Sequence, residues 1–558
     1  VLPLAGALAL AAALALFGSG PGTSGARINL GPVQPMEIVR LLLAVFLAGY
    51  FARRWEVVRQ VRGTALRRWR LPSWMDVPRP DLVLPVAAAV MASLVLFFLL
   101  RDLGPALLLS LTFLVMFAVA RARVGLALAG LAVLVAGFYA GHRLGISSTL
   151  SARIGMWWSP WENVVRGGDQ VAHALWAFAG GALAGTGVGL GATRFLPAVH
   201  TDLALAAIGE ELGVAGIATT VVAFGVIAWR GLRIARSAST DYGFFLAMAM
   251  SLSLVLPAIV MFEGMTGVVP LTGLVTPFVS YGGSAMVANF GALGLLVACS
   301  SSSAESTRHE PFVAPTRWLV RVLGAAGVML LVVWGRVQVV WADDYLVRPQ
   351  LGRQADGGVR YQYNPRVLDA ARQLPRGTVF DRAGLPLATD DISLARADSD
   401  SFRRLGIVID EVCASEGGRC YPLGGAAFHV VGDATTRANW AASNSSYVER
   451  DAEGRLRGFD DRAVAVRTGD GGGVAMRRDY APIVTLVRHR WEPDHPDVRA
   501  VLERPRDVTL TIDARLQQQV ANILSRAVVS ARVKRGAAVV LDAATGHVRA
   551  SVSYPWPS

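Results

Sequence analysis

Three polar side chains, His200, Thr201 and Asp202, stand directly before a long apolar stretch of the sequence. This stretch, 203–229, is long enough to cross a bilayer, which takes about 20 apolar residues. An ionisable group at the edge of a membrane span is costly unless it is paired, faces water or has a function. Asp202 could accept a proton from a hydroxyl nucleophile held at the membrane surface. In the alternative interpretation, Thr201 or Asp202 only caps the helix that begins there.

Glu37 and Arg40 form a second charged group, at the start of the apolar stretch 34–52. They stand three positions apart and therefore share one face of a helix. Arginine suits the geometry of phosphate oxygens, so Arg40 could bind a pyrophosphate while Glu37 holds the guanidinium in place. The alternative is an ion pair whose long side chains reach the membrane surface and relieve each other's desolvation.

Other polar residues beside the apolar stretches are candidates only in combination. Asp102 lies between two apolar stretches, and Gln170 lies in the long loop 145–202. The turn PLTGLVTPFVSYGGS, at 270–284, leads into a further apolar stretch. It adds a set of small and polar residues, namely Ser280, Tyr281, Gly282, Gly283 and Ser284. Structural packing is the alternative interpretation for all of them.

The composition is typical of a membrane protein. Of the 558 residues, 53% are hydrophobic and 17% are charged, whereas soluble domains contain about 25% charged residues. The net charge of +13 comes almost wholly from arginine, since Lys534 is the only lysine. The arginines gather in loops beside apolar stretches, which the positive-inside rule explains more simply than nucleic-acid binding does.

The apolar stretches of span length predict eight membrane helices followed by a ninth. Loop 52–81 carries eight arginines and is expected in the cytoplasm, where alternation also places 301–317. The loops 19–33, 145–202 and 264–282 are then expected outside. The predicted helices cover 1–18, 34–52, 82–100, 103–121, 124–144, 203–229, 241–263, 283–300 and 318–341.

Residues 343–558 have the polar, strand-like character of a soluble region and are expected outside, after the ninth helix. The segments 375–391 and 536–553 each predict a hairpin, because apolar runs flank a turn that contains glycine. A strand is predicted at 507–513 and an amphipathic helix at 514–529.

Three further features each have two interpretations. The glycine-rich segment 180–191 is either a mobile or re-entrant stretch or a cover over a substrate site. Glu210 and Glu211 need partners inside the bundle, and we interpret them as structural. Cys413 and Cys420 could form a local disulfide if their region lies outside the cytoplasm, and two free thiols are the alternative.

Together, these motifs resemble the SEDS family, the polytopic FtsW and RodA glycosyltransferases that polymerise peptidoglycan from lipid II. The resemblance covers about 1–300 and implies a polytopic α-helical membrane fold, with eight spans visible of the ten that are usual in the family. It rests on GARINLGPVQPMEIVR (25–40), DLGPALL (102–108), GTGVGLG…LPAVHTDLALAAIGEELG (185–213) and PLTGLVTPFVSYGGSAMVAN (270–289), which occur in the family's order.

The resemblance implies roles for individual residues. The aspartate of the HTD motif is the family's proposed catalytic residue, and here it is Asp202. The family's Glu and basic residue correspond to Glu37 and Arg40. Arg40 stands where the family has Lys, and further departures are Met36, Pro105 and Ala285. We expect the substrate-binding or supporting residues to be Glu37, Arg40, Asp102, Gln170, His200, Thr201, Ser280, Tyr281, Gly282, Gly283 and Ser284.

The remaining sequence resembles the membrane-proximal part of a class B penicillin-binding protein. The resemblance rests on NPR…PRGTVFDRAGLPLA (364–388), YPLGGAAFHVVGD (421–433) and LTIDARLQQ…GAAVVLDAATGHVRASVSYP (510–555). It implies a linker at 301–317, a membrane anchor at 318–342, an extracytoplasmic α+β pedestal at 343–505 and the start of a transpeptidase domain at 506–558. The transpeptidase motifs S-x-x-K and K-[ST]-G do not occur, since Lys534 fits neither.

We therefore expect a multi-pass enzyme of the bacterial cytoplasmic membrane that polymerises lipid II at the outer face, fused to part of a class B penicillin-binding protein. Asp202 would deprotonate the acceptor 4-hydroxyl, and Arg40 with a divalent cation, Mg or Mn, would stabilise the leaving undecaprenyl pyrophosphate. Expected partners are these lipids, the membrane and proteins of the elongasome or divisome, with no nucleic acid. The alternatives are a flippase for lipid-linked precursors and a non-catalytic scaffold. A flippase predicts charges near the middle of several spans, whereas most charges here lie at the outer rim.

Overall fold

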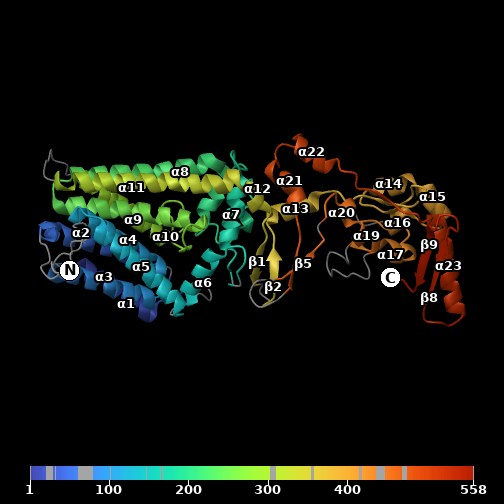
Figure 1. Cartoon of the computed structure of the whole chain (residues 1–558), viewed down its shortest axis with the longest axis horizontal. Helices are drawn as coiled ribbons and strands as arrows, with labels where there is room; N and C mark the ends of the chain where they lie inside the picture. Colours follow the sequence, from blue (N-terminus) through green and yellow to red (C-terminus); the bar gives the residue numbers. More distant parts are fainter. Residues whose placement is uncertain are drawn as a thin grey trace. The chain divides into compact units, whose positions relative to one another are not determined.

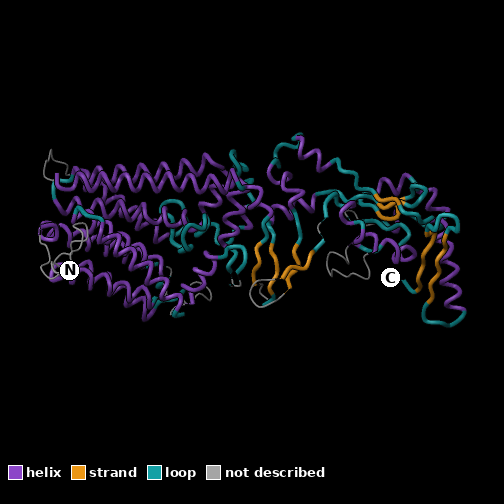
Figure 2. Tube along the Cα trace, in the orientation of Figure 1, coloured by secondary structure: helices purple, strands orange, loops and turns teal. Residues whose placement is uncertain are grey.

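The computed structural model divides the chain into two compact units, Val1–Gln362 and Tyr363–Ser558. The first unit is built mainly of long helices, and the second combines short helices with small sheets (Figure 1, Figure 2). The structure describes residues 2–20, 29–31, 33–60, 80–100, 102–145, 148–163, 165, 167–301, 310–353, 357–413, 418–434, 447–460, 462–467 and 474–556.

Every apolar stretch that was predicted to cross the membrane forms a helix. The helices of the first unit are α1 (Leu2–Phe17), α2 (Met36–Gln60), α3 (Pro80–Leu99), α4 (Leu103–Arg121), α5 (Gly125–Arg143), α6 (Ser148–Trp158), α7 (Gln170–Gly181), α8 (Ala204–Ser237), α9 (Asp241–Met265), α10 (Gly283–Ser301), α11 (Glu310–Gly335) and α12 (Ala342–Val347). A π-helical turn, Arg336–Val340, follows α11, and the short antiparallel strands β1 (Gln350–Arg353) and β2 (Val359–Gln362) follow α12.

Fewer of these helices meet the criteria for a membrane span than the sequence predicted. Among the described residues, six are long and apolar enough by length and composition, and they lie in α4, α5, α8, α9, α10 and the continuous stretch 310–340. The helix α1 and the apolar part of α3, Leu84–Leu99, are shorter. The last turns of α2 carry charged residues. The chain is thus a helical membrane protein with about six apolar spans.

The helix α9 forms the centre of the bundle. Its span window is 94% buried, against 11% for the spans that contain α5 and α11. A helix that is apolar on all sides is stable only when other helices or lipid surround it. The helices α8 and α11 lie side by side (Figure 1). Phe312 of α11 also stacks on Phe244 of α9 with ring centroids 4.4 Å apart, so α11 is a full member of the bundle.

The first unit extends beyond the predicted end of the anchor at residue 342. The backbone amide of Leu351 donates to the carbonyl of Trp161 at 2.7 Å, and the amide of Asn163 donates to the carbonyl of Leu351 at 3.2 Å. These bonds tie β1 to the loop between α6 and α7. The contact boundary therefore falls after Gln362.

Strand β3 organises the second unit, pairing antiparallel with β4 and parallel with β7. The two predicted hairpins and the predicted helix are confirmed, whereas the strand predicted at 507–513 is only two residues long. The strands are β3 (Val379–Phe380), β4 (Pro386–Ala388), β5 (Val464–Arg467), β6 (Val474–Arg477), β7 (Val508–Thr509), β8 (Gly536–Leu541) and β9 (Val548–Tyr554). The helices are α13 (Pro365–Gln373), α14 (Ile392–Ala397), α15 (Ser399–Arg404), α16 (Ile409–Val412), α17 (Gly425–Val431), α19 (Tyr447–Asp451), α20 (Glu453–Leu456), α21 (Val484–Arg488), α22 (Pro496–Leu502) and α23 (Ala514–Ser530).

A buried ionic network joins separate segments of the second unit. The guanidinium of Arg376 donates to a carboxylate oxygen of Glu449 at 2.7 Å and to one of Glu453 at 2.6 Å. Both carboxylates are fully buried. Arg419 binds the other oxygen of Glu449 and also donates to the carbonyl of Gly377 at 2.9 Å. Because Gly377 lies two residues before β3, the network fixes the β3–β4 hairpin to α19 and α20.

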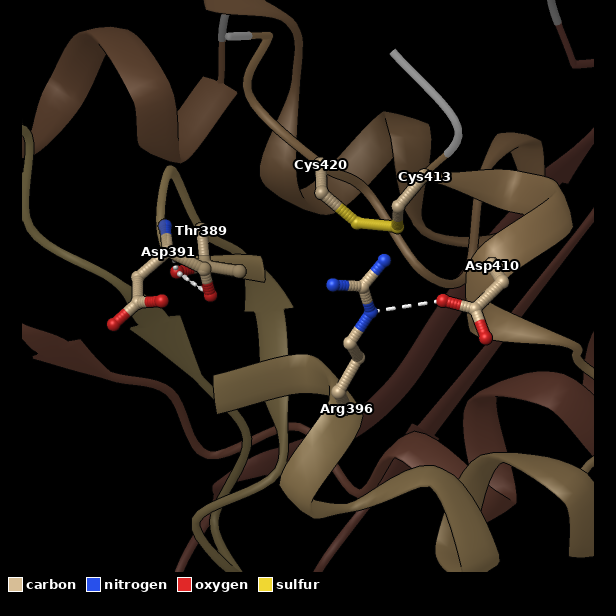
Figure 3. Close-up of a disulfide and its surroundings, with 6 residues drawn as sticks. All are labelled: Thr389, Asp391, Arg396, Asp410, Cys413 and Cys420. Atoms are coloured by element: carbon tan, nitrogen blue, oxygen red, sulfur yellow. Dashed lines mark hydrogen bonds and ion pairs between the residues drawn. A yellow bond between two sulfur atoms is a disulfide. The ribbon is translucent and has the colours of Figure 1, made fainter. Parts of the chain in front are cut away.

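A disulfide joins Cys413 and Cys420, whose Cα atoms are 5.3 Å apart (Figure 3). Of the two alternatives for these cysteines, the structure contains the bonded form. The ion pair between Arg396 of α14 and Asp410 of α16, at 2.8 Å, lies beside it (Figure 3). Arg419 of the ionic network directly precedes Cys420 in the chain, so the disulfide restrains the backbone that carries this arginine.

Replacing Glu449 by Gln is expected to lower the free energy of unfolding of the second unit by about 3–5 kcal/mol, because the buried guanidinium groups of Arg376 and Arg419 lose the carboxylate that they share and keep only Glu453 and Asp390, respectively, as acidic partners. Denaturant-dependent hydrogen exchange of the β3 amides in the intact protein measures this change. Asp400→Asn is the control, since Asp400 and its partner Arg403 have 88% and 71% of their side-chain surfaces exposed. Its expected effect is within about 1 kcal/mol, and equal small effects of both variants would contradict the prediction.

Candidate active site

The helix α8 is interrupted less than three turns after its start. Gly213 has φ 61° and ψ −149°, a backbone conformation that is nearly restricted to glycine. A methyl group on Gly213 would lie 2.4 Å from the backbone nitrogen of Gly185, so the close approach of the two segments also needs glycine. The helix α8 thus consists of a short first part, residues 204–212, and a long second part. We call the first part the half-helix.

The glycine-rich segment supplies hydrogen bonds to the end of the half-helix. The amide of Thr186 donates to the carbonyl of Glu210 at 2.9 Å, and the amide of Gly187 donates to the carbonyl of Glu211 at 3.0 Å. The fully buried side chain of Glu210 accepts a further bond from the amide of Ala192 at 2.9 Å. The glycine-rich segment is therefore a support for the half-helix, and the structural interpretation of Glu210 is confirmed.

Asp202 lies on a tight turn just before the half-helix. The carbonyl of Ala198 accepts bonds from the amides of Thr201 at 3.1 Å and Asp202 at 3.0 Å. Ala198 has a positive φ of 49°, which costs free energy for a residue with a side chain. The cap position of α8 is occupied by Leu203, and no side chain caps it. The interpretation of Thr201 or Asp202 as a helix cap is therefore wrong, because both residues belong to the turn that precedes the cap position.

Arg153 of α6 is the charged residue at this site that sequence reasoning missed. A methyl group placed on Gly273 would lie 2.8 Å from Nη2 of Arg153 and 3.5 Å from Oδ2 of Asp202, so both side chains reach the same glycine. Arg153 also donates to the carbonyl of Leu271. Its charge acts on both Asp202 and Asp102. The signal in the sequence was an arginine without a nearby acidic residue, in a loop between apolar stretches where a charge needs a partner.

Burial and the shared arginine set the protonation of the two aspartates. Burial raises the pKa of Asp102 to about 6, although the Gly104 amide and the Arg153 charge oppose the shift. Burial also raises the pKa of Asp202 above its usual range, and the charge of Arg153 again opposes the shift. Burial lowers the pKa of Arg153, whereas the two carboxylates favour its charged form. The cluster therefore holds a carboxylate with raised proton affinity beside a fixed positive charge.

The turn at 270–284, whose residues the family resemblance placed among the supporting residues, lies against the HTD motif. The amide of Tyr281 donates to the carbonyl of His200 at 2.7 Å, and their rings meet edge to face with centroids 6.1 Å apart. The hydroxyl of Ser284 accepts from the amide of Gln34 at 2.9 Å, which ties the same turn to the start of α2. Ser280 is buried, and its hydroxyl accepts from the amide of Thr276 within the turn. No contact recorded among the described residues gives Gly282 or Gly283 a role beyond backbone freedom.

Glu37 and Arg40 form the predicted ion pair, at 2.9 Å. The same guanidinium donates to the amide oxygen of Asn289 on α10 at 3.1 Å. Both side chains are largely buried, which does not fit a pair that reaches toward water. The charge of Glu37 also contributes to the raised pKa of Asp102, so this pair and the aspartate cluster belong to one electrostatic system.

Among the described residues, no group of three or more metal-ligating side chains includes Asp102 or Asp202, and the divalent cation stays a prediction. Three donors that could hold a metal come together only at His489, His495 and Asp497 in the second unit, as far as the described chain shows. At the candidate site, Glu37 instead pairs with Arg40, and the charge of Arg153 acts on Asp102 and Asp202. Gln170 is the first residue of α7, and among the described residues no hydrogen bond or ion pair joins it to Asp202.

Gly213→Ala is expected to lower the thermal stability of the membrane unit and to increase hydrogen exchange of the half-helix amides, because the added methyl group meets backbone atoms of Gly185 and Leu183. The backbone conformation alone would cost about 1–3 kcal/mol. The control is Gly225→Ala in the second part of α8, where a methyl group meets nothing within 4 Å. The prediction fails if both variants melt at the temperature of the unaltered protein in the same detergent.

Comparison with known proteins places the first unit in a family. Residues 4–305 match the FtsW/RodA/SpoVE family, described as cell cycle proteins. The peptidoglycan glycosyltransferase RodA of Mycobacterium leprae is 33% identical over 279 residues, which are 50% of this chain and 58% of that protein. Stage V sporulation protein E of Bacillus subtilis is 31% identical over 282 residues, 49% of this chain and 69% of that protein.

A solved peptidoglycan synthase complex contains a chain that is 22% identical, with a TM-score of 0.42 over 55% of this chain and 81% of that chain. The chain spans less than two thirds of the length of the mycobacterial relatives that it matches. The family match, in contrast, covers more than half of the 558 residues. The chain therefore belongs to the FtsW/RodA/SpoVE family.

Proposed function

We propose that the protein is a peptidoglycan glycosyltransferase that polymerises lipid II into glycan strands at the outer face of the bacterial cytoplasmic membrane. The relatives named as peptidoglycan glycosyltransferases support this reaction class. The observation that carries the proposal is the geometry at Asp202. This carboxylate caps no helix, lies within reach of Arg153 and stands where the family's sequence motif has its aspartate.

In the proposed reaction, Asp202 accepts the proton of the acceptor 4-hydroxyl as its oxygen attacks the anomeric carbon of the donor sugar. The bond between that carbon and the pyrophosphate oxygen breaks, and undecaprenyl pyrophosphate leaves with the bonding electrons. The proton remains on Asp202 until water removes it. A base works best when its pKa lies near the operating pH, so the raised pKa of Asp202 suits this role.

The basic residues divide two tasks in this proposal. Arg153 keeps Asp202 ionised before the reaction, because the arginine charge favours the carboxylate over the carboxylic acid. Arg40, held by Glu37 and Asn289, would stabilise the negative charge that develops on the pyrophosphate. A divalent cation, Mg or Mn, stays a prediction, and no step is assigned to it.

We further propose that the second unit corresponds to the membrane-proximal region of a class B penicillin-binding protein, held outside the cytoplasm as a pedestal. The disulfide between Cys413 and Cys420 supports this placement, since such bonds persist in oxidising compartments. The partners would then include this region in cis, lipid II and proteins of the elongation or division machinery.

The flippase alternative needs acidic groups that are free to act within the spans. Glu210 is fully buried and bound to a backbone amide, and Glu211 accepts a bond from the amide of Gly189 at 3.0 Å. Their engagement in the support of the half-helix favours the glycosyltransferase over the flippase.

Asp202→Asn is expected to lower the rate of lipid II polymerisation at least 100-fold, because the amide cannot accept the proton of the acceptor hydroxyl. The purified full chain, given lipid II, would be assayed by gel separation of the glycan products. Asp241→Asn is the matched control: Asp241 accepts a bond from Trp55 at 3.0 Å, and an asparagine oxygen can accept the same bond. If Asp202→Asn retains the rate of the unaltered protein, Asp202 is not the base.

Arg153→Gln is expected to move the acidic limb of the pH–rate profile to higher pH. The sign follows from the charge: Arg153 lowers the pKa of Asp202, so its removal raises that pKa further and the base is protonated at a higher pH. Activity would thus fall earlier on acidification, while the rate at alkaline pH would suffer less. A profile that is reduced equally at every pH would assign Arg153 to substrate binding instead.

A further inference from the structure

Gln338 is a fully buried polar side chain on the helical segment that follows α11. It lies in the π-helical turn Arg336–Val340. Such turns occur mostly as single insertions within α-helices, and they are frequent at functional sites. A buried amide group must form hydrogen bonds to offset its desolvation, so its partners indicate what the turn is for.

The side-chain nitrogen of Gln338 donates two hydrogen bonds to two different elements. One goes to the carbonyl of Ala182, just after α7, at 2.6 Å, and the other goes to the carbonyl of Gly209 in the half-helix at 2.9 Å. The approach depends on Gly181, where a methyl group would lie 2.8 Å from the same nitrogen and 2.0 Å from the Gly209 oxygen. One amide group thereby joins the anchor segment, the end of α7 and the half-helix.

The segment that follows Gln338 is fixed to the same outer loop by aromatic contacts. The ring of Tyr345 stacks on Trp161 with centroids 5.8 Å apart. Trp176 of α7 donates to the carbonyl of Arg348 at 3.1 Å. Trp161 follows the helix that carries Arg153, so the anchor segment contacts the supports of both charged groups of the candidate site.

We infer that Gln338 is a positioning residue that sets the place of Asp202 relative to Arg153. The inference rests on the proposed function for its catalytic consequence. Gly209 lies seven residues after Asp202, and the helical part between them, from Ala204, is only about 8 Å long at 1.5 Å per residue. A helix this short moves as a rigid body, so a displacement at the Gly209 carbonyl is passed to the turn that presents Asp202.

The first test replaces Gln338 by Met, which is similar in size and donates no hydrogen bond. The carbonyls of Ala182 and Gly209 would then lack this donor inside an apolar bundle. Hydrogen exchange of the amides in 182–191 and 204–212, measured on the full chain in detergent, is expected to rise at least 10-fold. The control is Thr316→Val in α11, which removes a buried hydroxyl bonded only to the carbonyl of Phe312 in its own helix as far as the described contacts show.

The second test measures lipid II polymerisation by the same variants. Gln338→Met is expected to lower kcat about 10- to 100-fold with KM changed less than 3-fold, since a shift of 1 Å in a reacting group costs on that order. The acidic limb of its pH–rate profile is expected to shift, because the distance between Asp202 and Arg153 changes. Gln338→Glu, which replaces the donor by an acceptor, is expected to be at least as impaired. Thr316→Val keeps the unaltered kcat and pH profile.

The two tests separate the inference from the proposed function. If hydrogen exchange of the half-helix in Gln338→Met matches that of Thr316→Val, Gln338 does not position the half-helix, whatever the enzymatic activity. If exchange rises but kcat and the pH profile stay unaltered, the positioning role for Asp202 is wrong. If the unaltered protein makes no glycan, the proposed function fails, while the exchange test still decides whether Gln338 holds the half-helix.

Discussion

Backbone carbonyl groups inside a membrane protein must find donors within the protein, and the break in α8 at Gly213 creates this need beside the candidate site. The carbonyls of Gly209, Glu210 and Glu211 accept bonds from Gln338, Thr186 and Gly187. Two separate segments, the glycine-rich segment and the turn that carries Gln338, thus hold nine residues of helix. The half-helix therefore has the orientation that those segments impose, rather than the one that a continuous α8 would dictate.

The charged groups of the candidate site also have few partners. Asp102 and Asp202 come from different elements and share the single guanidinium of Arg153, so each carboxylate is only partly compensated. A fully paired aspartate would have a lowered pKa and would be a weak base. Burial against one shared arginine leaves the pKa raised instead. The strained Ala198 turn keeps Asp202 in this environment instead of allowing it to cap the helix.

The sequence predicted the parts of this arrangement that depend on local pattern. Helical apolar runs, the hairpin at β3 and the pair of Glu37 and Arg40 follow from spacing alone, and each is present. The family resemblance, and not the spacing of the residues, implied that Asp202 and the turn at 270–284 belong to one site. The helix-cap interpretation failed because residue type alone does not reveal where α8 begins. The turn at Ala198 places Leu203, and not Thr201 or Asp202, at the cap position of α8.

The sequence could not predict contacts between segments far apart in the chain. Arg153 lies 51 residues after Asp102 and 49 residues before Asp202, so no local spacing links it to either partner. The glycine-rich segment allowed two interpretations because glycine permits both mobility and close approach. The glycine-rich segment is identified as a support only by the hydrogen bonds that its amides donate to the carbonyls of α8.

Gln338 shows why the connection between α11 and the bundle matters physically. A lone buried amide contributes only about 1 kcal/mol net through a typical hydrogen bond, which would hold a free helix weakly. Here α11 and α8 belong to one chain and pack along each other, so the Gln338 amide is present at a high effective concentration beside the half-helix. The same packing already provides most of the entropy loss that is needed to order the amide. A small interaction can therefore fix the half-helix, because the long helices that bear it are already in place. A substitution that removes the Gln338 amide but leaves the packing of α11 intact should therefore change the position of the half-helix more than it changes the stability of the bundle.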